Sequence, residues 1–348
     1  MKKILIVGAT GTLGQLVYRD IRRLFPEDVT FAITDYNKER GIDFASNKGK
    51  GTEWRYLNVM DAGSIEQALV GVDFVVILVK QLEPKIQELC IERKIPSLDV
   101  TPFYALYTDT IKYGDYALGQ ETGVLLFSGF LPGLSGLLIQ KAVANFDKIE
   151  SVDIGFLQNK NANVGITGIK DMLRLINEPI RNQEKTFSFS QTRKMSFLGH
   201  QKPKKVRNIE HAERLLLIDK YPISYWTGWS DNTFNTLIYI LKKAGLLPFI
   251  IKLSPNIMKK IVKHNPENPE EAILTVEVKG HIQNKLTIKR YSLQTFSDYQ
   301  TTSLVTAALL KIMLSKQVDG VVVPYEITNI DEVLGLINNK DIKLEEIE

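Results

Sequence analysis

Three glycines near the N-terminus stand at a spacing that could hold phosphate groups. Gly8, Gly11 and Gly14 follow an apolar run at residues 4–7 and overlap the start of an amphipathic stretch at residues 13–24. A buried strand, a glycine turn and a helix in this order are the context that a dinucleotide fingerprint requires. The free N–H groups and the positive dipole end at the helix start would attract the phosphates.

A carboxylate follows at the tip of the expected second strand, residues 29–34. In a Rossmann domain a carboxylate at this point binds the hydroxyls of the adenosine ribose, and Asp35 would repel a 2′-phosphate there. Lys38 and Arg40 come soon after and could accept that phosphate instead. The residues therefore predict NAD or NADP as the cofactor and favour NAD.

The elements that must position these groups alternate between strand and helix along the first 125 residues. The expected strands are residues 4–7, 29–34, 53–57, 73–79, 96–100 and 123–127. Short connections and right-handed crossovers predict an α/β fold with a doubly wound parallel sheet. After about residue 128 the pattern changes to antiparallel strand pairs and longer connections, which predicts a second, α+β domain.

Three residues at the tips of the later strands could exchange a proton with a substrate. Lys80 directly follows the fourth strand, Asp99 lies inside the fifth, and Tyr104 comes a few residues beyond it. Each also has a purely structural interpretation. The lysine could be a surface residue, the aspartate an acceptor for loop N–H groups, and the tyrosine a packing aromatic. Charge within an apolar strand is costly unless it is paired, so Asp99 must have partners.

Length and composition restrict the class of protein. At 348 residues the chain suits two domains, and its net charge of +4 is too small to indicate nucleic-acid binding. The single Cys90 excludes an intramolecular disulfide, and the four scattered histidines predict no metal site. The sequence has no run long enough for a membrane span and no signal-peptide pattern, so we expect a cytoplasmic protein.

Longer motifs resemble the saccharopine dehydrogenase-like family. The segment at 96–101 (PSLDVT) is similar to the family's strand that ends in Asp. The segment at 129–135 (GFLPGLS) resembles its Gly-Phe-Asp-Pro-Gly-Leu motif, with Leu131 in place of the acid. The segments at 299–303 (YQTTS) and 319–326 (DGVVVPYE) resemble its C-terminal helix and turn. The likeness is clearest over residues 1–145 and 270–335.

This resemblance implies an oxidoreductase that passes hydride between a nicotinamide and a C–N bond of an amino-acid-derived amine or imine. It also implies a cleft between two domains and C-terminal helices that return to the first domain. The expected domains are residues 1–128, 129–298 and 299–348. The departure at Leu131 puts the substrates of the named enzymes in doubt. The residues predicted to bind the cofactor are Gly8, Thr10, Gly11, Thr12, Leu13, Gly14, Asp35, Asn58, Val59, Val79, Thr101, Phe130 and Leu131.

Other interpretations stay open. The chain could be a dinucleotide-binding sensor or scaffold without turnover, or a short-chain-type reductase acting on C=O through Tyr239 and Lys243. Lys170 and Arg174, one helical turn apart, could bind a substrate carboxylate. Residues 237–263 mix bulky apolar side chains with lysines and could contact a membrane surface, form a dimer contact, close over the active cleft, or only cover the sheet of the second domain. A small-molecule substrate and a homodimer are the expected partners.

Overall fold

The computed structural model describes residues 1–27, 29–181, 186–254, 257–258 and 264–348. The chain divides into two compact units. The first contains residues 1–137 and 299–338, and the second contains residues 138–298 and 339–348. The expected segment 299–348 is therefore divided, because its last ten residues belong to the second unit.

The first unit is built around a seven-stranded parallel sheet in the order β13-β6-β5-β4-β1-β2-β3. Its strands are β1 (Lys2–Val7), β2 (Val29–Asp35), β3 (Thr52–Tyr56), β4 (Phe74–Ile77), β5 (Ser97–Asp99), β6 (Gly123–Leu125) and β13 (Gly320–Val322). The strand order reverses beside β1, as in a Rossmann fold. The predicted doubly wound domain is confirmed, and β13, which the sequence pattern missed, extends the sheet.

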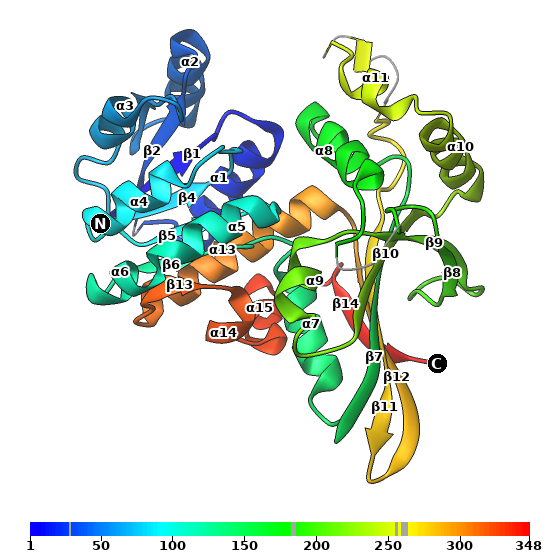
Figure 1. Cartoon of the computed structure of the whole chain (residues 1–348). Coiled ribbons are helices and arrows are strands. Elements are labelled where there is room, and N and C mark those ends of the chain that lie inside the picture. Colours follow the sequence, from blue (N-terminus) through cyan, green and yellow to red (C-terminus); the bar gives the residue numbers. More distant parts are fainter. Residues whose placement is uncertain (28, 182–185, 255–256, 259–263) are drawn as a thin grey trace. The chain divides into compact units, whose positions relative to one another are not determined.

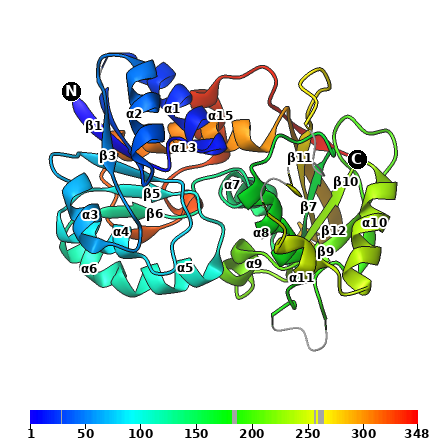
Figure 2. The ribbon, with the colours of Figure 1, turned by 90° about the horizontal axis from the view of Figure 1, so that it is seen from above.

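Helices cover both faces of this sheet (Figure 2). They are α1 (Thr12–Leu24), α2 (Lys38–Lys48), α3 (Ala62–Ala68), α4 (Lys85–Glu92), α5 (Tyr104–Thr110), α6 (Gly114–Gly119), α13 (Asp298–Ser315), α14 (Pro324–Ile327) and α15 (Ile330–Ile337), with a 3₁₀ turn at Ile111–Tyr113. On one face α3 and α4 pack their apolar residues on strands β1 and β4, and the predicted core residue Cys90 is fully buried there. Helix α7 (Leu134–Val143) begins in the first unit and continues into the second.

Helix α13 carries out the predicted C-terminal return to the first domain (Figure 1). Twelve of its eighteen residues are buried. Ser303 Oγ donates to Asp20 Oδ2 of α1 at 2.6 Å, and Thr306 Oγ1 donates to the carbonyl oxygen of Ser128 at 2.9 Å. The helix thus fastens the segment after β6 to the core of the first unit.

The second unit has a mixed seven-stranded sheet in the order β14-β12-β11-β7-β10-β9-β8. Its strands are β7 (Lys148–Gln158), β8 (Thr192–Met195), β9 (Lys204–Ile209), β10 (Ile223–Trp229), β11 (Ala272–Ile282), β12 (Lys285–Thr295) and β14 (Lys343–Ile347). Its other helices are α8 (Ile166–Asn177), α9 (Ala212–Leu217), α10 (Asn232–Lys243) and α11 (Leu247–Ile251). The predicted α+β second domain is confirmed.

Two stretches of the second unit fold differently from what their sequences indicate, which is a strand at 186–190 and a solvated loop at 202–207. The stretch 186–190 is not a strand, because Phe189 adopts a left-handed conformation (φ 66°) and only an isolated bridge joins Phe187 to Pro179. The basic stretch 202–207 is not only a surface loop, since residues 204–209 form β9. Polar, lysine-rich strands occur toward the edge of a sheet, where one side faces water, so their sequences resemble loops.

Candidate nucleotide site and its surroundings

The glycine turn after β1 has the geometry that phosphate binding needs. Gly8 has φ 90°, and a Cβ built on Gly14 would lie 2.1 Å from the Gly8 carbonyl oxygen, so α1 packs directly on the turn. A Cβ on Gly11 would meet only that same oxygen, at 3.4 Å, and the space around Gly11 is otherwise open. Gly11 also begins α1 without a side-chain cap, so the N–H groups of Thr12, Leu13 and Gly14 point toward this space. The turn therefore fits a pyrophosphate.

The carboxylate at the end of β2 is held by a cluster of donors. Thr10 Oγ1 donates to Asp35 Oδ2 at 2.5 Å, and the N–H of Asn37 donates to Oδ1 at 2.8 Å. Arg40 donates to both oxygens, through Nε at 2.5 Å and Nη2 at 2.7 Å. Burial opposes ionisation, but the hydrogen bonds from Arg40 and Thr10 hold the pKa of Asp35 below its ordinary value. Asp35 is thus a buried anion paired with a half-exposed guanidinium.

This pairing joins two residues that predict different cofactors, NAD for Asp35 and NADP for Arg40. Asp35 would accept from ribose hydroxyls, whereas Arg40 would bind a 2′-phosphate. The Arg40 guanidinium also lies over the ring of Tyr36, 5.3 Å from its centroid. Asp35 thus holds Arg40 at the end of β2, whereas among the described residues no ion pair joins Lys38 to this carboxylate.

The next strand ends place Asn58, Val59 and Val79 at the same edge of the sheet. The backbone N–H of Asn58 donates to Ser64 Oγ at 3.0 Å, and the N–H of Met60 donates to Asn58 Oδ1 at 3.1 Å. Val59 and Val79 pack on the core beneath. The structure thus brings these three predicted cofactor-binding residues to the end of the sheet where the glycine turn lies.

Asp99 is the most unusual ionisable group of the first unit. It is fully buried at the end of β5, where Thr101 N donates to Oδ1 at 2.6 Å and Gln87 Nε2 donates to Oδ2 at 2.7 Å. Gln87 Oε1 in turn accepts from Gln81 Nε2 at 3.0 Å, so a buried chain of polar groups links β5, α4 and the loop after β4. Burial raises the pKa of Asp99 to about 7, although these hydrogen bonds favour its charged form.

The other two proton-exchange candidates lie nearer the surface. Lys80 is exposed, and its ammonium lies 4.0 Å from the ring centroid of Phe103, so the loops after β4 and β5 meet. Tyr104 begins α5 and stacks on Tyr107, which stacks on Phe127 after β6. Lys80 and Tyr104 can therefore be reached from solvent, whereas the Asp99 carboxyl is covered by its partners.

Helix α13 holds the segment that follows β6. The N–H of Phe130 donates to Thr302 Oγ1 of α13 at 3.3 Å, and the Phe130 side chain is fully buried. Leu131 is half-buried and precedes a cis proline at position 132. Of the two, Leu131 has the side chain that can contact a bound molecule, and Phe130 serves the core.

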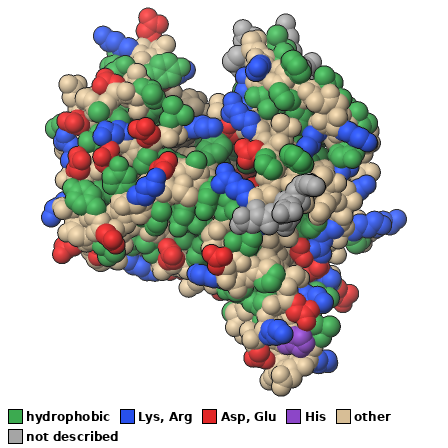
Figure 3. All heavy atoms as spheres, viewed as in Figure 1, with side chains coloured by type: hydrophobic (Ala, Val, Ile, Leu, Met, Phe, Trp, Pro, Cys, Tyr) green, Lys and Arg blue, Asp and Glu red, His purple; other side chains and the backbone are tan. Residues whose placement is uncertain are grey.

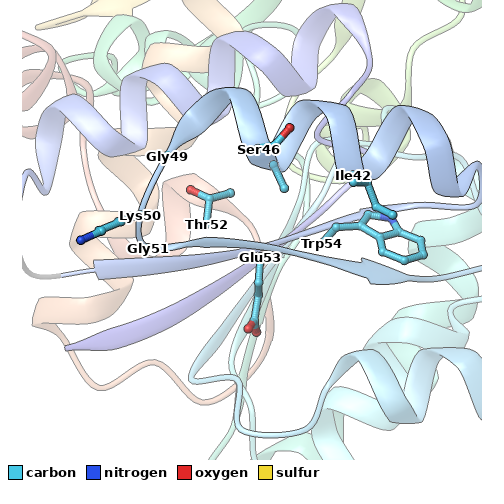
Figure 4. Close-up of a pocket in the computed structure, with 9 residues that line it drawn as sticks. Ile42, Ser46, Gly49, Lys50, Gly51, Thr52, Glu53 and Trp54 are labelled. Carbon is cyan, nitrogen blue, oxygen red and sulfur yellow. The ribbon is translucent and has the colours of Figure 1, made fainter.

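The first unit also has a pocket that lies apart from the glycine turn and Asp35. It has a volume of about 430 Å³ and lies between α2 and the start of β3, lined by Ser46, Thr52 and Trp54 among others (Figure 4). Thr52 pairs with Phe31, four residues before Asp35 along parallel strands. The pocket therefore lies toward the amino ends of the strands, away from the carboxyl ends where the glycine turn and Asp35 lie (the nucleotide edge).

Comparison with known proteins gives the family of this domain. Residues 4–123 match the model of the saccharopine dehydrogenase NADP binding domain. Residues 4–123 of the first unit therefore belong to this domain family. No curated protein sequence matches the chain.

A solved structure shows the same fold over the whole chain. The saccharopine dehydrogenase (L-Glu forming) of Saccharomyces cerevisiae, in its apo form, aligns over 100% of both chains with a TM-score of 0.72 and 13% identity. The C. glutamicum DAP dehydrogenase aligns over 96% of this chain and 98% of its own, with a TM-score of 0.47 and 14% identity. An engineered D-amino acid dehydrogenase bound to NADP⁺ aligns over 97% and 95%, with a TM-score of 0.49 and 13% identity. The chain has an NADP-binding, dehydrogenase-like fold.

The remaining functional candidates from the sequence lie in the second unit. Tyr239, the tyrosine of the short-chain-type pair, lies under the guanidinium of Arg207, 3.9 Å from its ring centroid. Lys170 Nζ donates to the carbonyl oxygen of Leu253 at 2.7 Å, and Arg174 pairs with Asp171. All of these side chains are engaged within the second unit, so the predicted carboxylate clamp of Lys170 and Arg174 is not preformed.

The sequence interpretation missed a pair of cations in this unit. Arg207 is buried in β9, where its Nη1 donates to the Phe189 carbonyl at 3.2 Å and its Nε has no hydrogen-bond partner among the described residues. Lys242 Nζ donates to the carbonyl oxygens of Ile176 and Ser188. Burial and the charge of Arg207 lower the pKa of Lys242 to about 8. Arg207 lies in a basic run that resembles a loop, and because Val206, Arg207 and Asn208 are all buried, no alternation in the sequence could have indicated its burial.

A second buried cluster lies in the turn between β9 and β10. Glu210 pairs with Arg214 at 2.9 Å, and Tyr225 donates to Glu213 Oε2 at 2.8 Å. His211 stacks on Tyr225, and burial lowers the pKa of its imidazole to about 3, so the ring is neutral. The cluster is held by its own ion pair, hydrogen bond and ring stacking, although His211 Nδ1 and Arg214 Nη1 have no hydrogen-bond partner among the described residues.

Within the described ranges, no three or more His, Cys, Asp or Glu side chains gather where they could hold a metal ion. Across the same ranges, no helix has the length and apolar character to cross a membrane.

Proposed function

We propose that this protein is an NAD(P)-dependent oxidoreductase that transfers hydride at a C–N bond of an amino-acid-derived amine or imine. The observation that carries the proposal is the shared edge of the parallel sheet. There the open glycine turn and the Asp35–Arg40 pair lie at the ends of β1 and β2, and Lys80 and Asp99 lie at the ends of β4 and β5. Ligands of open parallel sheets bind at this edge.

The cofactor and the chain have separate roles in this reaction. The bound dinucleotide supplies the hydride acceptor or donor. The glycine turn and the start of α1 would hold its pyrophosphate, and Asp35 or Arg40 its adenosine ribose. The choice of a C–N bond is supported by the family match of residues 4–123.

The proton that accompanies hydride transfer needs a group beside the substrate nitrogen. We assign this role to Lys80, because its ammonium is exposed next to the Phe103 ring, and we keep Tyr104 as the second candidate. Asp99 would act as a positioning residue, since its hydrogen bonds through Gln87 and Gln81 fix the loop that carries Lys80.

The test begins with fluorescence titration of the purified full chain with NADH and NADPH. Cofactor oxidation is then followed with pairs of amines and oxo acids. Lys80→Met should lower kcat at least about tenfold and remove one limb of the pH–rate profile, while cofactor affinity stays the same. Lys50→Met is the matched control, because Lys50 is exposed in the same unit at the opposite edge of the sheet. No binding of either cofactor would end the proposal. Tight binding without turnover would favour the sensor or scaffold.

A further inference from the structure

Helices α10 and α11 of the second unit are apolar on both sides. Their inner side packs Ile238 and Leu247 against Phe189 and Trp229 in a buried cluster. A helix that only covers a core carries polar residues on its outer side. Here the outer side carries large apolar side chains that are 44–69% exposed. They are Leu237 and Ile240 of α10 and Leu246 and Phe249 at the start of α11, and Ile257, which follows α11 in the chain, is exposed as well.

The charge of this region has one sign. Residues 232–266 contain no Asp or Glu and six lysines, at positions 242, 243, 252, 259, 260 and 263. Lys243 and Lys252 are exposed among the apolar side chains, whereas Lys242 is engaged with backbone carbonyls. Figure 3 shows hydrophobic and basic side chains together over these helices. We call the five exposed apolar side chains, with Lys243 and Lys252, the α10–α11 surface.

We propose that the α10–α11 surface docks on a membrane leaflet that contains anionic lipid. Phe249 and Leu246 would enter the boundary between headgroups and acyl chains, and the two lysines would lie among the phosphates. Charge favours this occupant over a second copy of the chain. A symmetric contact would place the lysines of both copies together, with no acidic residue in the segment to pair with them.

Co-sedimentation with vesicles tests the proposal on the full chain. We expect it to pellet with vesicles of phosphatidylcholine mixed with phosphatidylglycerol at low salt. It should not pellet with phosphatidylcholine alone, and high salt should release it. The double variant Leu246→Ser, Phe249→Ser should bind at least about tenfold more weakly. Its melting temperature should be unchanged, because both side chains are exposed.

The chain offers a matched control on another surface. Leu286 and Ile288 of β12 are 54% and 47% exposed, so Leu286→Ser, Ile288→Ser removes comparable apolar area elsewhere in the same unit. This control should bind vesicles like wild type. Reversing the charges of Lys243 and Lys252 to Glu should weaken binding by at least about tenfold, since each basic residue near an anionic leaflet contributes a factor of about five.

Site-specific labelling supplies a readout that sedimentation does not. Cys90 is the only cysteine, and it is buried with its thiol pKa raised, so Phe249→Cys can be labelled selectively with an environment-sensitive dye. We expect a blue shift on anionic vesicles. The proposal is overturned by absent pelleting at low salt, by equal loss in the β12 control, or by an unshifted dye. It is also overturned if sedimentation velocity shows a dimer that Phe249→Ser dissociates.

Discussion

Arg40→Met should separate the affinities for NADPH and NADH. In the structure Arg40 donates two hydrogen bonds to Asp35, but half of its side chain is exposed, so it can turn to a 2′-phosphate without unfolding anything. The variant removes that phosphate ligand and leaves Asp35 with Thr10 and Asn37 as its donors. The carboxylate can then accept from a ribose hydroxyl, and it repels a phosphate without compensation.

The size of the effect follows from the exposure of Arg40. A charge-assisted hydrogen bond to phosphate is worth about 1.5–3 kcal/mol, and solvent screening at a half-exposed side chain places this one toward the lower end. At about 1.4 kcal/mol per tenfold change, the Kd for NADPH should rise roughly 10–30-fold. The Kd for NADH should stay constant or fall a few-fold.

Fluorescence titration of both cofactors at low and high salt measures this ratio. Arg23→Met is the matched control, because Arg23 is an exposed arginine in the last turn of α1, at the far end of that helix from the phosphates. Asp35→Asn should move the ratio in the opposite direction, toward NADPH. Equal changes in both Kd values for Arg40→Met, or an equal effect of Arg23→Met, would refute the assignment of Arg40.

Three further predictions concern stability and the glycine turn. Gly11→Ala should melt within about 2 °C of wild type yet bind the cofactor at least about tenfold more weakly, because the new Cβ occupies only the open space before α1. Gly14→Ala should lower the melting temperature by several degrees, since its Cβ would overlap backbone; equal melting of the two variants would contradict this. Asp99, with its pKa raised to about 7, keeps a proton in the folded state that the unfolded chain releases near pH 4. The free energy of unfolding of the wild type should therefore fall as the pH rises from about 4 to about 7. Urea midpoints at about pH 5 and pH 8 measure this fall, and Asp99→Asn should remove it; the same difference between the two midpoints in the variant would exclude Asp99 as its cause. Arg214→Met should lower the free energy of unfolding by about 3–5 kcal/mol in chemical denaturation, because Glu210 would stay buried without its partner.

Much of the first unit could be predicted because its signals are local. A buried parallel strand is a continuous apolar run, and a tight turn beside a helix start needs glycine, so β1, the turn and α1 can be identified from fourteen residues. The apolar stretch of α13 required burial by composition alone. The strands of the second unit were harder to identify. Residues 204–209 and 343–347 carry many charges because one side of each strand faces water, and their pairing partners are distant in sequence.

The sequence by itself determined the residue types at the nucleotide edge, and only the tertiary structure decided how they act on one another. It placed Asp35 and Arg40 near each other in the chain as alternative ligands of the adenosine ribose, but the turn into α2 brings them into an ion pair. It placed Asp99 within a strand, but the burial and the contacts with Gln87 and Thr101 that set its pKa come from three different elements. It showed lysines and apolar residues mixed in 237–263, but only packing decided which of them remain exposed. The physical reason is that composition and periodicity are properties of neighbours in the chain, whereas charge pairing, desolvation and exposure depend on neighbours in space.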